Sequence, residues 1–177
     1  MELNKKGEFA MHDKLTESDI EKIEKEIEYR KLVVRKEAIE AVKEARAQGD
    51  LSENFEYHAA KKDKNKNESR IRYLERMIKT AEVISDNSDE DEVGLNNLVK
   101  VYFIEDDEIE EYKIVTTVRG DSLKGLISIE SPIGKAILGH KAGETVHVKV
   151  NEQYGYDVKI LEIIKNTDDS EDKIRKF

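Results

Sequence analysis

The chain has 177 residues, of which 37% are hydrophobic and only 6% aromatic, a composition that is thin for one compact core and favours a partly extended architecture. Its 40 acidic and 31 basic residues give a net charge of -9, which argues against broad nonspecific binding to nucleic acid but is compatible with a local basic strip. Cysteine is absent, which excludes disulfides and thiolate chemistry, and the four scattered histidines offer no zinc-ligand spacing.

The hydrophobic runs of the chain are short. None approaches the roughly 20 residues that cross a bilayer, and residues 1–14 lack the apolar centre of a signal peptide. We therefore expect a soluble protein of the cytoplasm with no membrane partner, in which residues 1–14 form a flexible extension.

The first predicted element is a long helix over residues 16–47, which contain no proline or glycine. Small or branched apolar residues recur there at steps of three, four or seven, the narrow stripe of a coiled-coil seam. A helix of roughly 30 residues is about 45 Å long. Thr16 and Asp19 are suited to cap its start, and Gly49 to end it. The stripe consists of Ile20, Ile23, Ile27, Val34, Ala38, Ala41 and Ala45.

A second segment without glycine or proline covers residues 54–84, and its similar length predicts an antiparallel helical hairpin. Residues 61–69 contain no apolar side chain, so we expect weak packing in the middle of this helix. The predicted contacts are Phe55, Ala59 and Ala60 near the turn and Ile71, Leu74, Ile78 and Ala81 far from it.

A basic strip occupies residues 61–72, with six basic side chains against two acidic ones. Exposed ion pairs contribute only about 0–1 kcal/mol each, so one interpretation is a solvated, lightly paired face. The other is contact with a nucleic-acid backbone. The six basic residues are Lys61, Lys62, Lys64, Lys66, Arg70 and Arg72.

The period changes after an acidic stretch at residues 85–97, which we interpret as a linker. Alternating β-branched and aromatic runs then predict short strands, and Ser131, Pro132 and Gly139 are suited to begin and end one short helix. The expected parts are an extension at 1–14, a helical hairpin at 15–84, a linker at 85–97, an α+β domain at 98–165 and a frayed polar tail at 166–177.

Two carboxylates, Asp50 and Glu53, stand three residues apart between the two predicted helices. Their spacing matches a capping box, in which each side chain bonds a backbone N–H at the start of a helix. In the alternative interpretation they supply oxygen ligands to Mg²⁺, which takes one or two protein carboxylates and completes its shell with water or substrate. Spacing leaves both open, and the second requires a partner molecule, because two acids do not form a complete catalytic site.

Other signs of catalysis are weak. His58 follows Glu53 by five residues, but a lone exposed histidine on a helix is more often inert. The sequence shows no Ser/His/Asp arrangement, phosphate-binding glycine loop or metal-ligand cluster, which disfavours an independent enzyme.

Two longer motifs carry a family resemblance: residues 45–61 read ARAQGDLSENFEYHAAK, and residues 127–139 read ISIESPIGKAILG. Together with shorter matches at 15–17, 26–29 and 68–71, they resemble the bacterial Gre family of transcript-cleavage factors, the GreA/GreB type. The resemblance covers residues 15 to 164. Two separate matches in the right order, joined by a linker, are highly specific.

The resemblance implies an α+β protein with an N-terminal antiparallel coiled-coil hairpin and a C-terminal domain of FKBP-like fold, made of antiparallel strands and a short helix. In the family, the C-terminal domain docks on RNA polymerase and the hairpin enters the secondary channel. The turn acids, Asp50 and Glu53 by position, there help hold Mg²⁺ while the polymerase cleaves backtracked nascent RNA. The chain is thus expected to be a monomer that stimulates the polymerase, without being an enzyme and without binding Mg²⁺ tightly alone.

The resemblance also suggests contacts and alternatives. The chain departs from the family pattern at residues 35–37 and 64–67, so the middle of the hairpin is expected to pack or contact RNA differently. One alternative function is a channel-binding regulator without cleavage stimulation, and another, from the FKBP-like resemblance alone, is an isomerase or chaperone. The candidate RNA contacts are Arg46, Lys61, Lys62, Lys64 and Lys66, and the candidate polymerase-docking residues are Ser131, Pro132 and Ile133.

Overall fold

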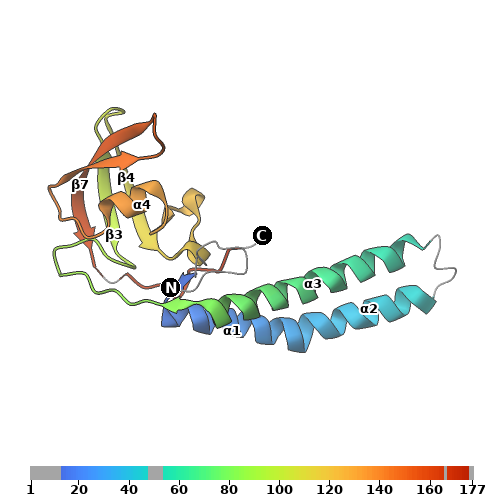
Figure 1. Ribbon diagram of the computed structural model, residues 1–177. Coiled ribbons are helices and arrows are strands. Elements are labelled where there is room, and N and C mark those ends of the chain that lie inside the picture. Colours follow the sequence, from blue (N-terminus) through green and yellow to red (C-terminus); the bar gives the residue numbers. More distant parts are fainter. Residues whose placement is uncertain (1–12, 48–53, 166, 176–177) are drawn as a thin grey trace, which may run out of the picture. The chain divides into compact units, whose positions relative to one another are not determined.

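The computed structural model describes residues 13–47, 54–165 and 167–175 (Figure 1). Within these, residues 20–47 and 54–81 form one compact unit, and residues 13–19 with 82–165 and 167–175 form the other. The fold is α+β, as expected. In the described part of the chain, no helix is both long and apolar enough to span a membrane.

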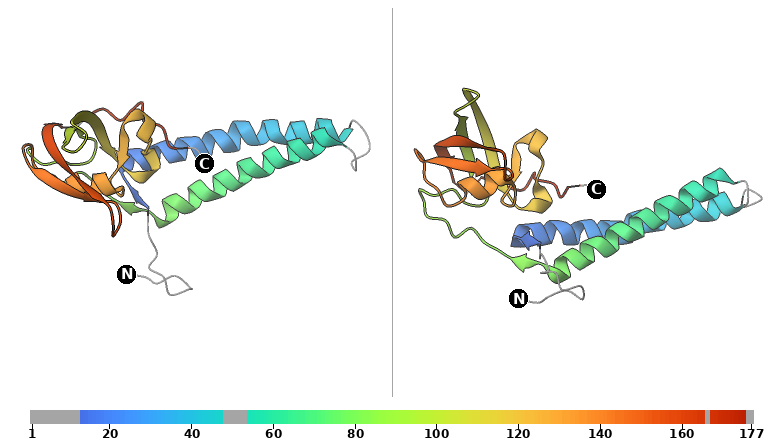
Figure 2. Two further views of the ribbon diagram at one scale, coloured as in Figure 1. Left: turned by 90° about the horizontal axis from the view of Figure 1, so that it is seen from above. Right: turned by 45° about the horizontal axis from the view of Figure 1, so that its top comes forward.

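The helical unit is an antiparallel hairpin whose two arms lie side by side in each view (Figure 2). The first arm comprises α1 (Glu17–Tyr29), a π-helical turn η1 (Arg30–Val34) and α2 (Arg35–Ala47), and the second is α3 (Phe55–Thr80). Thr16 and Asp19 cap the start of α1, as predicted, and the structure shows that they form a capping box: the backbone N–H of Asp19 donates to Thr16 Oγ1 at 3.1 Å, and that of Thr16 donates to Asp19 Oδ2 at 2.9 Å.

The seam between the arms differs from the predicted stripe near the turn. Phe55, Ala59 and Ala41, which we expected at the seam, are exposed. The π-helical turn holds one more residue than an α-helical turn, which rotates the contact face of α2. On α3 the seam keeps a regular spacing of three and four, but it passes through polar side chains that an apolar pattern does not reveal. Its members there are Tyr57, Ala60, Lys64, Asn67, Ile71 and Leu74.

The middle of the hairpin is held by a buried polar layer, so the expected weak packing was wrong. Asn67 is buried; its Nδ2 donates to the Arg30 carbonyl at 3.3 Å, and its Oδ1 accepts from Arg30 Nη1 at 3.2 Å. Glu26 accepts from Arg30 Nε at 2.7 Å and from Arg70 at 3.0 and 3.1 Å. Burial alone would raise the pKa of Glu26, but the hydrogen bonds from Arg70 and Arg30 outweigh it and lower the pKa.

Acid is therefore expected to loosen the hairpin through Glu26. Because its pKa is lower in the folded state, its contribution is complete above the ordinary glutamate value of about 4.3 and is lost as pH falls through the folded pKa. Replacing Glu26 by Gln should cost about 1–2 kcal/mol at neutral pH and flatten this acid dependence. Urea unfolding followed by helical circular dichroism measures both. Glu24→Gln, an exposed change on the same helix, is the control, and equal acid dependence in both variants would contradict the assignment.

The second unit is built on a five-stranded sheet in the order β5-β4-β3-β7-β6. Its strands are β3 (Leu98–Phe103), β4 (Glu108–Val115), β5 (Leu126–Ser128), β6 (Thr145–Lys149) and β7 (Gly155–Ile164). Neighbouring strands are antiparallel except β4 and β5, whereas the sequence led us to expect antiparallel strands throughout. The parallel pair is possible because two short 3₁₀ turns, η2 (Thr117–Arg119) and η3 (Ser122–Lys124), carry the chain back between them. A separate parallel pair joins β1 (Lys14–Leu15) to β2 (Glu82–Val83).

The core of this unit lies between the sheet and α4 (Pro132–Ile137) (Figure 1). Alternate strand residues point inward, including Val99, Val101, Val158 and Ile160. Ser131 caps α4 by accepting from the Gly134 backbone N–H at 3.1 Å, with Pro132 at the first helical position, as predicted.

The C-terminal segment, residues 167–175, is bonded to the second unit rather than frayed as the sequence suggested. The backbone N–H of Thr167 donates to the Asn96 carbonyl at 2.9 Å, and that of Arg175 donates to the Val118 carbonyl at 2.8 Å. Between them, Asp172 accepts from Lys113 Nζ at 2.8 Å. Hydrophobicity does not reveal this segment because its anchors are backbone groups and charges.

Candidate functional site

The two acids that the sequence singles out, Asp50 and Glu53, lie outside the described residues. The residues on either side are described: α2 ends at Ala47 and α3 begins at Phe55. The N-cap of α3 is Asn54, which differs from a capping box in which Asp50 would begin the helix. The start of α3 therefore does not require either acid as its cap.

Asn54 ties the two arms together at this end of the hairpin. Its Oδ1 accepts from the Tyr57 backbone N–H at 2.9 Å, and its Nδ2 donates to the Ala45 carbonyl at 2.6 Å. One side chain thus caps α3 and satisfies a carbonyl near the end of α2. We did not single out Asn54 from the sequence, although asparagine directly before a helical run is a usable N-cap signal.

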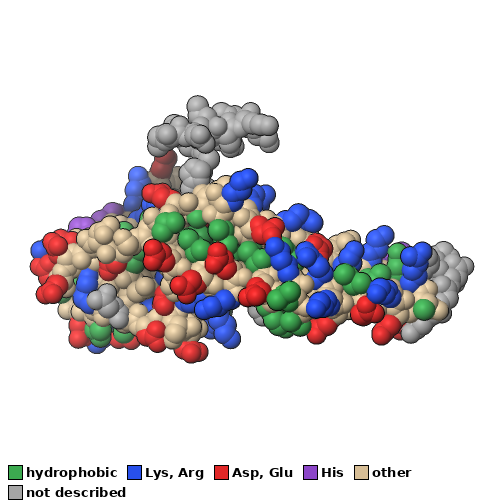
Figure 3. Space-filling model, turned by 90° about the horizontal axis from the view of Figure 1, so that it is seen from below, with side chains coloured by type: hydrophobic (Ala, Val, Ile, Leu, Met, Phe, Trp, Pro, Cys, Tyr) green, Lys and Arg blue, Asp and Glu red, His purple; other side chains and the backbone are tan. Residues whose placement is uncertain are grey.

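The basic residues predicted to contact RNA do not all share one environment. Arg46, Lys61, Lys62 and Lys66 are exposed, whereas Lys64 is half-buried at a seam position. Figure 3 shows lysine and arginine side chains recurring along the hairpin, interspersed with acidic and apolar ones. The strip is therefore a mixed surface, and contact between these lysines and RNA stays a prediction.

Arg70 belongs to the buried layer rather than to an open strip. Its guanidinium makes two hydrogen bonds with Glu26, and its side chain is largely buried. A cation so paired is less available to a phosphate than an exposed lysine, since binding would cost the existing bonds. The outer face of α3 is thus left mainly to its lysines.

The predicted docking residues divide into one exposed side chain and two that serve the fold. Pro132 is exposed. Ser131 is committed to the α4 cap, and Ile133 is 9% exposed within the core, so its side chain is not presented for docking. Next to them, Glu130 pairs with Lys135 at 2.9 Å and Lys14 at 3.1 Å, and hydrogen bonds from these lysines lower the pKa of Glu130.

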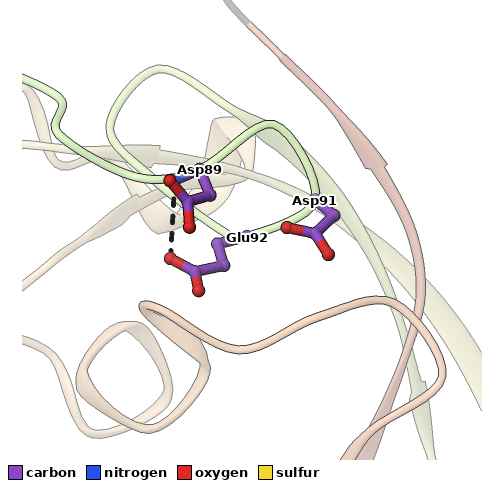
Figure 4. Close-up of side chains that lie close together, drawn as sticks. All are labelled: Asp89, Asp91 and Glu92. Carbon is purple, nitrogen blue, oxygen red and sulfur yellow. Dashed lines mark hydrogen bonds between the residues drawn. The ribbon is translucent and has the colours of Figure 1, made fainter.

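A cluster of acids in the segment before β3 consists of Asp89, Asp91 and Glu92 (Figure 4). Two lysines lie against it: Lys141 Nζ is 2.7 Å from Asp91 Oδ2, and Lys165 Nζ donates to the backbone carbonyls of Asp89 and Glu92 at 2.8 Å. The hydrogen bond from Lys141 lowers the pKa of Asp91. Asp91 is thus already paired with a cation, the three acids lie on an exposed loop, and we assign no metal there.

The most buried charge cluster of the second unit surrounds Arg119, whose side chain is fully buried. Its Nε lies 2.6 Å from Asp19 Oδ1, and its Nη1 lies 3.0 Å from Asp172 Oδ2. Thr116 Oγ1 donates to the other oxygen of Asp19 at 2.7 Å. The cluster joins three stretches of this unit that are distant in sequence, so we infer that its role is to stabilise the fold.

Two family models match most of the chain. A model described as "Transcription elongation factor, N-terminal" matches residues 14–83, and one described as "Transcription elongation factor, GreA/GreB, C-term" matches residues 87–165. Residues 167–175 thus lie beyond the matched stretch.

Whole-chain relatives agree with these matches. Transcription elongation factor GreA of Lachnoclostridium phytofermentans is 40% identical over 153 residues, which cover 86% of this chain and 95% of the relative. The protein of the same name from Mesoplasma florum is 45% identical over 147 residues, covering 82% of this chain and 94% of the relative. Among solved structures, the transcription factor Gfh1 aligns at 25% identity and a TM-score of 0.43, covering 88% of this chain and 99% of that one.

Proposed function

The chain belongs to the GreA/GreB family of transcription elongation factors, and we propose that it binds RNA polymerase and stimulates cleavage of backtracked nascent RNA. In this proposal the hairpin enters the secondary channel of the polymerase and brings Asp50 and Glu53 to the catalytic centre. The polymerase remains the enzyme. Cleavage frees a new RNA 3′ end and restarts an arrested complex.

The observation that best supports the proposal is the way the hairpin ends. Asn54 bonds the end of α2 to the start of α3, so residues 48–53 connect two arms that are fixed to each other. The buried layer around Asn67 and the apolar contacts of Ile71 and Leu74 stiffen the rest of the hairpin. A rigid support of this kind favours catalysis because positioning of groups replaces a random search.

The donor set at the turn suits Mg²⁺, since two carboxylates are the number of protein ligands that this hard cation commonly takes. Bound there, the ion would activate water and offset the charge that develops on the scissile phosphate. In this proposal the role of the chain is to provide two carboxylate donors, Asp50 and Glu53, at the end of the helical hairpin. Neither acid needs to hold the ion alone, because the polymerase would share it.

Stalled, backtracked polymerase complexes test the proposal. The full chain should shorten the 5′-labelled RNA faster than polymerase alone in the presence of Mg²⁺, and the shortened transcript should resume elongation. Binding to the polymerase without faster cleavage would instead identify a channel-binding regulator and contradict the proposal.

A further inference from the structure

Phe55 is the most exposed large apolar side chain of the described hairpin, at 86%. It is the first residue of α3, directly after the Asn54 cap, and the seam passes through Tyr57 and Ala60 instead. Its ring therefore contributes little to the packing among the described residues of the hairpin. An exposed aromatic ring that the fold does not use is a candidate contact for another molecule.

The neighbours of Phe55 on the outer face of α3 are polar or small. Positions three, four, seven and eleven residues further along an α-helix lie on the same face, and here they are His58, Ala59, Lys62 and Lys66, all exposed. Neither Lys62 nor Lys66 forms an ion pair with another described residue. At 1.5 Å per residue, Lys62 lies about 10 Å along the helix from Phe55.

The ring of His58 is held beside that of Tyr57, with centroids 5.5 Å apart in an edge arrangement. The Tyr57 ring has a second neighbour, Lys61, whose Nζ lies over the ring at 5.9 Å from its centroid. Aromatic rings and lysine side chains thus lie close together in the first two turns of α3. Single-stranded nucleic acids are bound by this combination, in which bases stack on rings and phosphates meet basic side chains.

We propose that Phe55 stacks on an unpaired base of the backtracked RNA, with Lys62 and Lys66 approaching its phosphates. The proposal rests on the proposed function, which supplies the RNA. Only one residue, Asn54, separates Phe55 from Glu53, so two virtual Cα–Cα bonds limit the distance between their Cα atoms to about 7 Å. A base adjoining the phosphate under attack is therefore within reach of the ring.

The side chains around Phe55 favour RNA, rather than an apolar surface of the polymerase, as the partner of the ring. The core of a protein interface needs several large apolar side chains packed together. On this face of α3, the first four turns present one large apolar ring among His58, Ala59 and lysines. A single ring beside cations fits a flat, negatively charged ligand better than an apolar surface.

A cleavage assay with RNAs that lack one base tests the stacking. Backtracked complexes are prepared with a normal RNA or with an abasic nucleotide at each backtracked position in turn. On normal RNA, Phe55→Leu, which keeps an apolar side chain but removes the ring, should lower the cleavage rate about tenfold. Phe55→Trp should retain the rate. On the RNA that lacks the stacked base, the full chain and Phe55→Leu should be equal.

A second readout does not depend on cleavage. The base analogue 2-aminopurine, placed at the position found with the abasic series, should lose fluorescence when the chain binds and keep it with Phe55→Leu. Tyr29→Leu, which removes another exposed ring of the hairpin, is the matched control and should change neither readout.

The outcomes separate the two proposals. If Phe55→Leu is equally slow on every RNA, the ring contacts the polymerase and stacking is wrong; if it is as fast as the full chain, the ring has no role and stacking is wrong. Quenching of 2-aminopurine without cleavage would support stacking while contradicting the proposed function. If the full chain causes no quenching and no cleavage, both proposals are wrong.

Discussion

Replacing Asp50 by Asn or Glu53 by Gln should reduce stimulated cleavage by about 100-fold or more while leaving binding to the polymerase intact. Each amide keeps the size of the side chain but removes the negative charge that a shared Mg²⁺ requires. Loss of one preorganised electrostatic contact to a transition state commonly costs this much. The measurement is the single-turnover rate of RNA shortening in backtracked complexes at saturating factor.

Because both acids are proposed to hold one ion, their effects should not multiply. The double variant is expected to be about as slow as the worse single variant. A higher Mg²⁺ concentration should restore part of the activity of each single variant, since the remaining carboxylate still binds. Glu56→Gln, at an exposed acid in the first turn of α3, is the control and should have little effect. Undiminished cleavage by either single variant, or a double variant far slower than both, would contradict the shared site.

The features of the fold that could be predicted from the sequence depend on local signals. The period of apolar residues predicts the two arms of the hairpin, and glycine, proline and capping residues mark the ends of short elements. The Thr16 and Asp19 caps and the Ser131 cap were confirmed because each is set by residues three positions apart. Such contacts need no knowledge of the tertiary structure.

The features that escaped prediction depend on contacts between distant residues. The charge cluster of Arg119 joins partners about 100 and 50 positions away, Asp19 and Asp172, and no spacing pattern connects them. The π-helical turn rotates α2, so the apolar period placed Ala41 at the seam although it is exposed. Asn67 occupies a core position that an apolar pattern rejects.

The candidate site shows the same division. The family motif predicts Asp50 and Glu53 as metal ligands from sequence alone, and both lie outside the described residues. The ring of Phe55 required the structure, because its apolar side chain had placed it in the seam. The metal-binding role proposed for the turn thus comes from the sequence motif. The proposal that an RNA base binds beside it comes from the exposure of the Phe55 ring on the folded helix.

Replacing Arg119 by Met should lower the free energy of unfolding of the second unit by about 3–5 kcal/mol. The side chain is fully buried, so its loss leaves Asp19 and part of the charge of Asp172 without a cation. Lys113 still pairs with Asp172 at 2.8 Å, whereas among the described residues Asp19 is left with the hydrogen bonds from the Thr116 hydroxyl and the Thr16 backbone N–H. The buried Asp19 carboxylate therefore accounts for most of the expected loss.

Hydrogen exchange of the β3 and β4 amides measures this loss within the second unit, because exchange reports the opening of each region separately. Lys100→Met is the matched control in the same unit: it removes a cation from a partly exposed pair with Glu162 and should have a much smaller effect that salt reduces further. Adding Asp172→Asn to Arg119→Met should cost less than Asp172→Asn costs alone, since the carboxylate removed has already lost one partner. Equal losses in the Arg119 and Lys100 variants, or additive effects in the double variant, would show that the cluster does not act as a unit.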